Sequence, residues 1–197
     1  MEVFLIVNYV ILIIIIFLNL KYRKKLNKLK VTNEQLKIQI KEKQEEISKD
    51  PMTGVKNKKV IMDHIEYLLL HKIKFCILLL DIDNFKSIND NLGHYQGDIC
   101  IKKLAHISKY LIKSTDFVGR YGGDEFVIIV TDANDKTIES IANRLLDKIR
   151  QDTIFTISIG IYTNELNDTV ENIIEKADKA LYKAKNLGRD RVEFYKW

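Results

Sequence analysis

Arg120-Tyr121-Gly122-Gly123-Asp124-Glu125-Phe126 is the most informative segment of this chain. Its paired glycines separate the run 116–121 from an apolar run that begins after two acids. Two adjacent glycines supply the positive φ angles of a tight turn, so the stretch predicts a two-residue β-hairpin. A hairpin at the edge of a sheet, with solvated acids and no function, would show the same local pattern. The rest of the chain is needed to decide between a functional and a purely structural hairpin.

A second pair of acids lies at the end of another apolar run. Asp81 and Asp83 flank Ile82 directly after the run 77–80, which predicts a buried strand with carboxylates at its exit. Acids at a strand end are usually solvated or cap a helix. We nevertheless expect these two to converge with the two hairpin acids, because carboxylate and carbonyl oxygens are the ligands that Mg²⁺ prefers.

Strand and helix patterns alternate beyond Pro51, the only proline. The predicted strands cover 75–80, 126–130, 155–161 and 192–195, and the predicted helices lie near 60–70, 99–112, 137–149 and 170–185. Together with the hairpin, this alternation predicts an α+β domain with a mixed sheet.

A polar segment marked by glycines, 85–98, links the first acid pair to the next predicted helix. Lys86 in this segment could contact a phosphate. Asn89 and Asp98 carry the donors and acceptors that read a guanine edge. Without further context, a turn residue and a helix N-cap are the simpler interpretations of Asn89 and Asp98.

The N-terminal segment predicts a membrane anchor. Residues 3–20 carry no charged side chain, and at about 1.5 Å per residue a helix of that length nearly spans a hydrocarbon core of about 30 Å. Basic residues follow over 21–30, which places the rest of the chain in the cytoplasm. A cleaved signal peptide is disfavoured because the basic residues come after the apolar run. We therefore predict a single-pass helix over 1–20 in the cell membrane.

A helical linker is expected over 21–49. Leu26, Leu29, Asn33, Leu36 and Ile40 follow alternating steps of three and four, which is typical of a short coiled coil. An Asn in the core of the stripe favours a parallel dimer. A single solvated helix is nearly as compatible with so few heptads. The boundary of the folded domain, 50–197, falls at the turn that Pro51 begins.

The composition argues against several other classes of protein. The net charge of +5 is concentrated in the basic cluster behind the apolar run, so nucleic acid is not an expected partner. Cys76 and Cys100 lack partners at metal-ligand spacing and predict buried, reduced thiols rather than a disulfide or a zinc site.

Five stretches resemble motifs of the GGDEF domain of diguanylate cyclases, in the same order. They are Asp50-Pro-Met-Thr-Gly54, Asp81-Ile-Asp-Asn-Phe-Lys-Ser-Ile-Asn-Asp-Asn-Leu-Gly-His-Tyr-Gln-Gly-Asp98, Arg120-Tyr-Gly-Gly-Asp-Glu-Phe126, Ser158-Ile-Gly160 and Ala180-Leu-Tyr-Lys-Ala-Lys-Asn-Leu-Gly-Arg189. The resemblance covers about 50–197. It implies a mixed, mostly antiparallel sheet flanked by helices, similar to the nucleotidyl cyclases and the palm of polymerases.

The resemblance also implies an activity: a homodimer condenses two GTP into cyclic di-GMP and releases pyrophosphate, with Mg²⁺ or Mn²⁺ as cofactor. The implied residues fall into three groups. Asp124, Glu125 and Lys86 would be catalytic; Asp81, the Ile82 carbonyl and Asp124 would hold the metal; and Asn89, His94, Asp98, Gly122, Gly123, Lys185 and Arg189 would bind the substrate. Because Asp98 is present, we expect GTP to be preferred over ATP.

One motif departs from the family pattern. The inhibitory product site of the family is Arg-x-x-Asp, whereas this chain has Lys113-Ser-Thr-Asp116. Lysine lacks the planar fork that pairs with phosphate or guanine, so the site is expected to be degenerate.

Two alternatives to an active cyclase remain open. A catalytically silent domain could bind GTP or cyclic di-GMP and regulate a membrane partner, and the charged linker could serve mainly as a scaffold. Against the first, the hairpin acids of this chain are intact.

Overall fold

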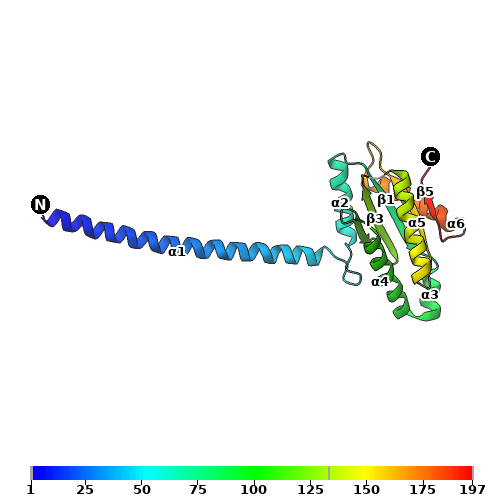
Figure 1. Cartoon of the computed structure of the whole chain (residues 1–197), viewed down its shortest axis with the longest axis horizontal. Coiled ribbons are helices and arrows are strands. Elements are labelled where there is room, and N and C mark those ends of the chain that lie inside the picture. Colours follow the sequence, from blue (N-terminus) through cyan, green and yellow to red (C-terminus); the bar gives the residue numbers. More distant parts are fainter. Residues whose placement is uncertain (1, 133, 197) are drawn as a thin grey trace. The chain divides into compact units, whose positions relative to one another are not determined.

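The computed structural model describes residues 2–132 and 134–196, without the side chains at positions 2–5, 7 and 10. The chain divides into two units. The first is the helix α1 (Glu2–Ile47), and the second begins at Ser48 and holds every other element labelled in Figure 1.

Helix α1 runs without a break through the segments predicted as a membrane span and a linker. Among the residues described, no helix is long and apolar enough to cross a membrane. The predicted span over 1–20 therefore has no support from the structure, and it includes side chains outside the described set. Leu26, Leu29, Leu36 and Ile40 of the predicted coiled-coil stripe are exposed on α1, and their pairing with a second chain stays a prediction.

The second unit is built on a five-stranded sheet of order β2-β3-β1-β4-β5. Its strands are β1 (Phe75–Ile82), β2 (Phe117–Arg120), β3 (Glu125–Thr131), β4 (Ile157–Thr163) and β5 (Val192–Phe194). All neighbouring pairs are antiparallel except β4 and β5, which are parallel. The prediction of a mixed, mostly antiparallel sheet in an α+β domain is confirmed.

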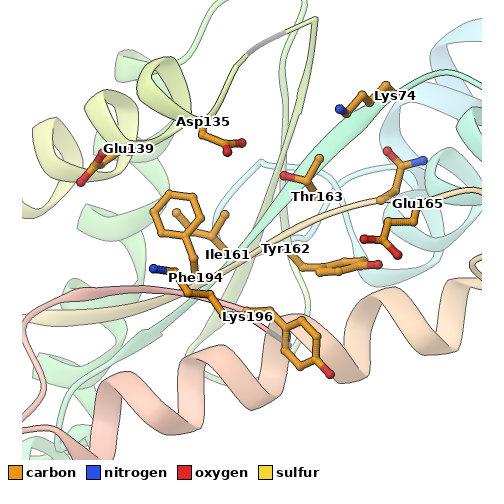
Figure 2. A pocket seen from close by; sticks show the side chains of 11 residues that line it. Lys74, Asp135, Glu139, Ile161, Tyr162, Thr163, Glu165, Phe194 and Lys196 are labelled. Carbon is orange, nitrogen blue, oxygen red and sulfur yellow. The ribbon is translucent and has the colours of Figure 1, made fainter.

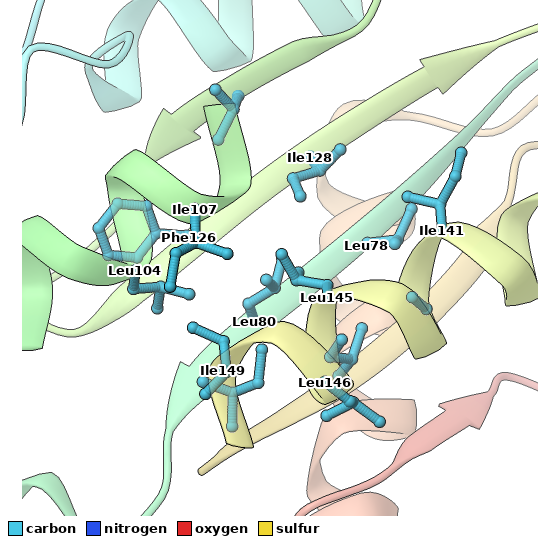
Figure 3. Packing of buried hydrophobic residues seen from close by; sticks show 14 of the residues in the cluster. Leu78, Leu80, Leu104, Ile107, Phe126, Ile128, Ile141, Leu145, Leu146 and Ile149 are labelled. Carbon is cyan, nitrogen blue, oxygen red and sulfur yellow. The ribbon is translucent and has the colours of Figure 1, made fainter. Parts of the chain in front are cut away.

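Helices cover both faces of this sheet. They are α2 (Lys58–Leu70), α3 (Phe85–Leu92), α4 (His94–Leu111), α5 (Asp135–Asp152) and α6 (Val170–Asn186). Because side chains alternate along a strand, β1 sends Leu78 and Leu80 to the α4 and α5 side and Ile77 and Leu79 to the α2 and α6 side. Figure 3 shows the first of these cores, where Leu80 packs among side chains of α4 and α5.

Polar side chains set the starts of three helices. Asn57, Asn134 and Thr169 each accept a hydrogen bond from a backbone N–H in the first turn of α2, α5 and α6, respectively. Such caps satisfy donors that a helix leaves unpaired at its N-terminus.

The hairpin differs from its prediction. Neither Gly122 nor Gly123 has a positive φ, and four residues rather than two connect β2 to β3. The Glu125 carbonyl accepts the N–H groups of both Tyr121 (2.8 Å) and Gly122 (3.2 Å). The Arg120 side chain binds the glycine carbonyls, so this wider loop is closed by a side chain rather than by glycine geometry.

A second difference concerns the segment predicted as a loop before α4. Residues 85–92 form α3, and α4 begins at His94, five residues before the predicted start. Helix α3 buries none of its residues fully; only Phe85 and Ile88 pack against the core. Its eight residues are mostly polar and none is fully buried, so the segment has the composition of a loop.

Gly160 provides a test of the fold. A Cβ at this position of β4 would collide with backbone atoms of Ala177 and Leu181 in α6. Gly160→Ala is therefore expected to lower the free energy of unfolding by about 1–3 kcal/mol or more, measured by chemical denaturation. Gly123→Ala is the matched control: a Cβ there meets nothing within 4 Å, so about 0.5 kcal/mol or less is expected. Equal losses would contradict the close contact of β4 with α6.

Candidate active site

The acids of the two motifs meet at one edge of the sheet. Asp81, near the end of β1, is the register partner of Glu125, which opens β3, and of Ser158 on β4. Because β1 and β3 are antiparallel, the exit of one strand lies beside the entry of the other. The predicted convergence of the hairpin acids with Asp81 is therefore what the register produces.

Asp81 is the buried member of this group, with 8% of its surface exposed. Burial raises the pKa of its carboxyl to about 6, and the neighbouring Asp124 and Glu125 charges act in the same direction. The Lys185 ammonium opposes them by binding Asp81 Oδ2 at 2.8 Å. This carboxylate thus lies where negative charge accumulates and a cation is favoured.

The two hairpin acids are half-buried. Asp124 ends the loop and Glu125 opens β3. A Cβ at Gly122 would lie 2.5 Å from Glu125 Oε2, so this glycine leaves room for the acidic side chain. A Cβ at Gly123 would face open space. The close approach of a nucleotide to these glycines stays a prediction.

Asp83 does not join the other three acids, so the expected convergence of four was wrong. This carboxylate is 4% exposed and turns toward β4, where it accepts hydrogen bonds from Thr156 Oγ1 (2.7 Å) and Ser158 Oγ (2.6 Å). These donors satisfy it inside the fold, so its oxygens are not available at the edge of the sheet.

The donors at this edge fit a divalent cation. Mg²⁺ typically takes one or two carboxylates and completes its shell with water and substrate phosphates. Asp81, Asp124 and the Ile82 carbonyl are the predicted ligands, and the electrostatic coupling of Asp81 with Asp124 and Lys185 indicates that positive charge is favoured here. Within the described residues, no group of three or more His, Cys, Asp or Glu side chains is placed as a ready metal cage.

Helices α3 and α4 carry the predicted guanine-binding residues. Lys86 and Asn89 lie on α3, His94 opens α4 and Asp98 lies in its second turn. Gly93 is the N-cap of α4, so the N-cap interpretation of Asp98 was wrong, as was the turn interpretation of Asn89.

Asn89 has an unusual environment. Its Oδ1 is buried and, among the residues described, has no hydrogen-bond partner. The same atom lies where a Cβ of Gly97 would be, so the glycine makes room for the amide between α3 and α4. A buried polar atom without a partner is rare in folded proteins, so Asn89 stands out among the predicted site residues.

Two basic residues come from the C-terminal end of α6. Lys185, in the last turn, reaches Asp81 across the sheet edge. Arg189 follows the helix in a left-handed conformation, with φ of 64°, and its side chain is exposed. The structure thus brings Lys185 to the acids directly, while Lys86 and Arg189 remain exposed on the helices and turns that follow β1 and α6.

Arg120 is a site residue that the sequence analysis missed. Its guanidinium donates to the carbonyls of Gly122 (3.1 Å) and Gly123 (2.6 Å) and to Asp50 Oδ1 (3.3 Å). Burial raises the pKa of Asp50, but hydrogen bonds from Thr53 and the charge of Arg120 outweigh it and hold the pKa below its usual value. The hairpin is therefore tied to the turn at the start of the domain.

The region predicted as a degenerate inhibitory site lies apart from the acids. Asp116 Oδ2 accepts the Lys113 N–H at 3.1 Å, and both residues line a pocket of about 420 Å³. Lys49, Lys56 and Lys109 also line it. The pocket is basic but offers ammonium groups rather than a guanidinium fork.

A larger cavity, of about 650 Å³, lies at the opposite end of the sheet. Figure 2 shows that Lys74, before β1, and Thr163, at the end of β4, line it with Asp135 of α5. None of the predicted site residues contributes to it. Its size alone does not connect it with the chemistry of the acids.

Comparison with known proteins agrees with this arrangement. The family described as "Diguanylate cyclase, GGDEF domain" matches residues 47–191. Diguanylate cyclase A of Treponema denticola is 36% identical over 129 residues, which are 61% of this chain and 35% of that protein. Diguanylate cyclase DgcP of Pseudomonas aeruginosa is 33% identical over 160 residues, which are 73% of this chain and 23% of that protein.

A solved structure supports the fold. The coiled coil and GGDEF domain of DgcB from Caulobacter crescentus, in complex with c-di-GMP, superimposes with a TM-score of 0.78 at 24% identity, covering 87% of this chain and 98% of that one. This chain spans about a quarter to a third of the length of the curated relatives named above. The family match covers most of the chain, and the acids at the edge of the sheet come from two of the motifs that resemble the family. The chain belongs to the GGDEF family of diguanylate cyclase domains.

Proposed function

We propose that this protein is a diguanylate cyclase that condenses two GTP molecules into cyclic di-GMP. The main support for the proposal is that Asp81 on β1 is the register partner of Glu125 on β3 and that the Lys185 ammonium binds the buried Asp81 carboxylate. In each of two steps, a 3′-oxygen bonds to the α-phosphorus of the other GTP, the bond to pyrophosphate breaks and the hydroxyl proton passes to a base. The products are one cyclic dinucleotide and two pyrophosphates.

Different residues of the site carry out different parts of this reaction. Asp124, with Glu125 beside it, is the base for the 3′-hydroxyl, because both carboxylates are half-buried at the edge. Lys86, Lys185 and Arg189 bind the phosphates, and Lys185 has to exchange the Asp81 carboxylate for a phosphate oxygen. A Mg²⁺ or Mn²⁺ ion bound by Asp81, Asp124 and the Ile82 carbonyl would offset negative charge on the phosphates.

The guanine is recognised between α3 and α4. Asn89 Oδ1 has no partner among the described residues, and in this proposal the Asn89 amide turns toward the base. Asp98 accepts from the N–H edge of guanine, which ATP does not present in the same pattern. His94 lies at the first position of α4, the helix that also carries Asp98. GTP is therefore the preferred substrate.

A homodimer is required, because one chain carries one such edge and the product needs two nucleotides facing one another. The exposed stripe of α1, with Asn33 within it, supplies a parallel pairing surface. The DgcB structure likewise contains a coiled coil next to its GGDEF domain. We place the first residues of α1 in the cell membrane, on the strength of the uncharged run 3–20 and the basic cluster after it.

The first prediction concerns turnover. The protein incubated with GTP and Mg²⁺ is expected to release cyclic di-GMP, detected by chromatography, and little product is expected from ATP. Asp124→Asn should lower turnover by about 10²-fold or more, because the base is lost while the fold stays intact. GTP binding without turnover by the wild type would instead favour a silent, nucleotide-binding regulator. Full activity of the variant would remove Asp124 from the mechanism.

The second prediction concerns Gly97. Gly97→Ala forces the Asn89 amide out of its position and should weaken GTP binding by about five- to tenfold, as expected for one lost hydrogen bond. Asn89→Ala is the matched variant and should cost a similar factor. The double variant should bind no more weakly than Asn89→Ala alone, measured by titration calorimetry. Additive losses would show that the glycine acts through something other than Asn89.

The third prediction concerns α1. The full chain is expected in the membrane fraction after an alkaline wash, and residues 21–197 should be soluble and dimeric. Residues 48–197 should be monomeric and at least tenfold less active at equal micromolar concentration, because assembly then depends on chance encounter. Sedimentation and product assays measure these outcomes. Equal activity of the two soluble forms would exclude α1 as the pairing element.

A further inference from the structure

Asp83 is a buried carboxylate that the mechanism above does not use. It is 4% exposed, and it accepts hydrogen bonds from three donors that come from two separate parts of the chain. Thr156 and Ser158, at the start of β4, account for two of them. The third is the backbone N–H of Asp190, which donates to Asp83 Oδ2 at 3.0 Å. Asp83 thus connects the exit of β1 to the turn that follows α6.

That turn is strained. Gly188 has φ of 113°, and Arg189 and Asp190 follow with φ of 64° and 49°. Two consecutive non-glycine residues in the left-handed region persist only where their surroundings hold them. The Arg189 N–H donates to the Ala184 carbonyl at 3.0 Å, which closes the end of the helix but does not reach Asp190.

Asp190 is held from two sides. Asp83 binds its N–H from within the fold. Arg150, on α5, binds it from the surface: Nε lies 2.9 Å from both carboxylate oxygens, and Nη2 donates to the Asp190 carbonyl at 2.9 Å. A planar guanidinium fork holds its partner in one orientation, so the two contacts together define the backbone of the turn.

The turn carries Arg189 just beyond Lys185, the residue that binds Asp81. We propose that Asp83 is a positioning residue for GTP, which through the Asp190 N–H holds the left-handed turn that presents Arg189 to the phosphates. This inference rests on the proposed function of the site. It assigns the second acid of the Asp81-Ile82-Asp83 motif to substrate orientation, with no role in binding metal.

The test uses the full chain in detergent, with a non-hydrolysable GTP analogue and Mg²⁺, and measures its dissociation constant. Asp83→Asn keeps the shape of the side chain but replaces one of its two acceptor oxygens with an NH₂ group and removes the negative charge, so one neutral oxygen is left for the three donors. Binding is expected to weaken about tenfold. In the Arg189→Ala background the same change should have little further effect, because the residue through which Asp83 acts is already absent.

A purely structural role for Asp83 gives a different result. It would produce the same fold-change with and without Arg189, and that outcome would overturn the proposal. Thr156→Val is the matched control, since it removes the donor to Asp83 that lies just before β4 but leaves the Asp190 contact. It should lower the melting temperature while leaving the dissociation constant unchanged. Weaker binding in this control, of the same size as in Asp83→Asn, would also count against the proposal.

A second variant keeps the test decisive if Asp83→Asn does not fold. Arg150→Ala acts on the same turn from the half-exposed surface of α5. It should weaken binding several-fold, again only when Arg189 is present, and Arg150→Lys should restore part of the loss. No effect of Arg150→Ala would overturn the proposal in that case.

The outcomes separate this inference from the proposed function. If the wild type binds the analogue and makes no cyclic di-GMP, while Asp83→Asn weakens binding through Arg189, the cyclase activity fails and the positioning role stands. If the wild type turns over GTP and Asp83→Asn binds like the wild type, the positioning role fails alone. A wild type that binds no analogue overturns both.

Discussion

The antiparallel register of β1 with β3 is the constraint on which the rest of the site depends. It sets Asp81 opposite Glu125, so a motif near the start of the domain and the hairpin some forty residues later share one edge. Both strands are buried on both faces, by α4 and α5 on one side and α2 and α6 on the other. A shift by one residue would turn every side chain of β1 to the opposite face and separate the acids.

Asp81, Asp124 and Glu125 concentrate negative charge at this edge of the sheet, and Lys185 of α6 neutralises part of it. The raised pKa of Asp81 expresses the cost of holding a buried carboxylate beside two other acids. Lys185 offsets part of this cost by binding Asp81 Oδ2. In the proposed function the same lysine binds a nucleotide phosphate, so substrate binding would exchange one anionic partner of Lys185 for another.

Residues outside the predicted substrate-binding set hold the loops at this edge of the sheet. Arg120 closes the hairpin by binding the glycine carbonyls, and Asp50 anchors that arginine from the start of the domain. Asp83 and Arg150 perform the corresponding task for the turn after α6. Buried carboxylates with several donors hold loops in conformations that the local sequence does not favour.

Apolar periodicity and motif spacing are local features, so they were enough to predict the α+β class, the strands around the acids and the family. The sequence also indicated Asp81, Asp124 and Lys185, whose types suit the chemistry. The three-dimensional contacts were needed to find that Asp83 turns away from these acids and that Arg120 links the hairpin to Asp50. Both contacts join residues far apart in the sequence, whose proximity no local pattern encodes. The helix over 85–92 was missed for a different reason, since its residues are mostly polar and none is fully buried.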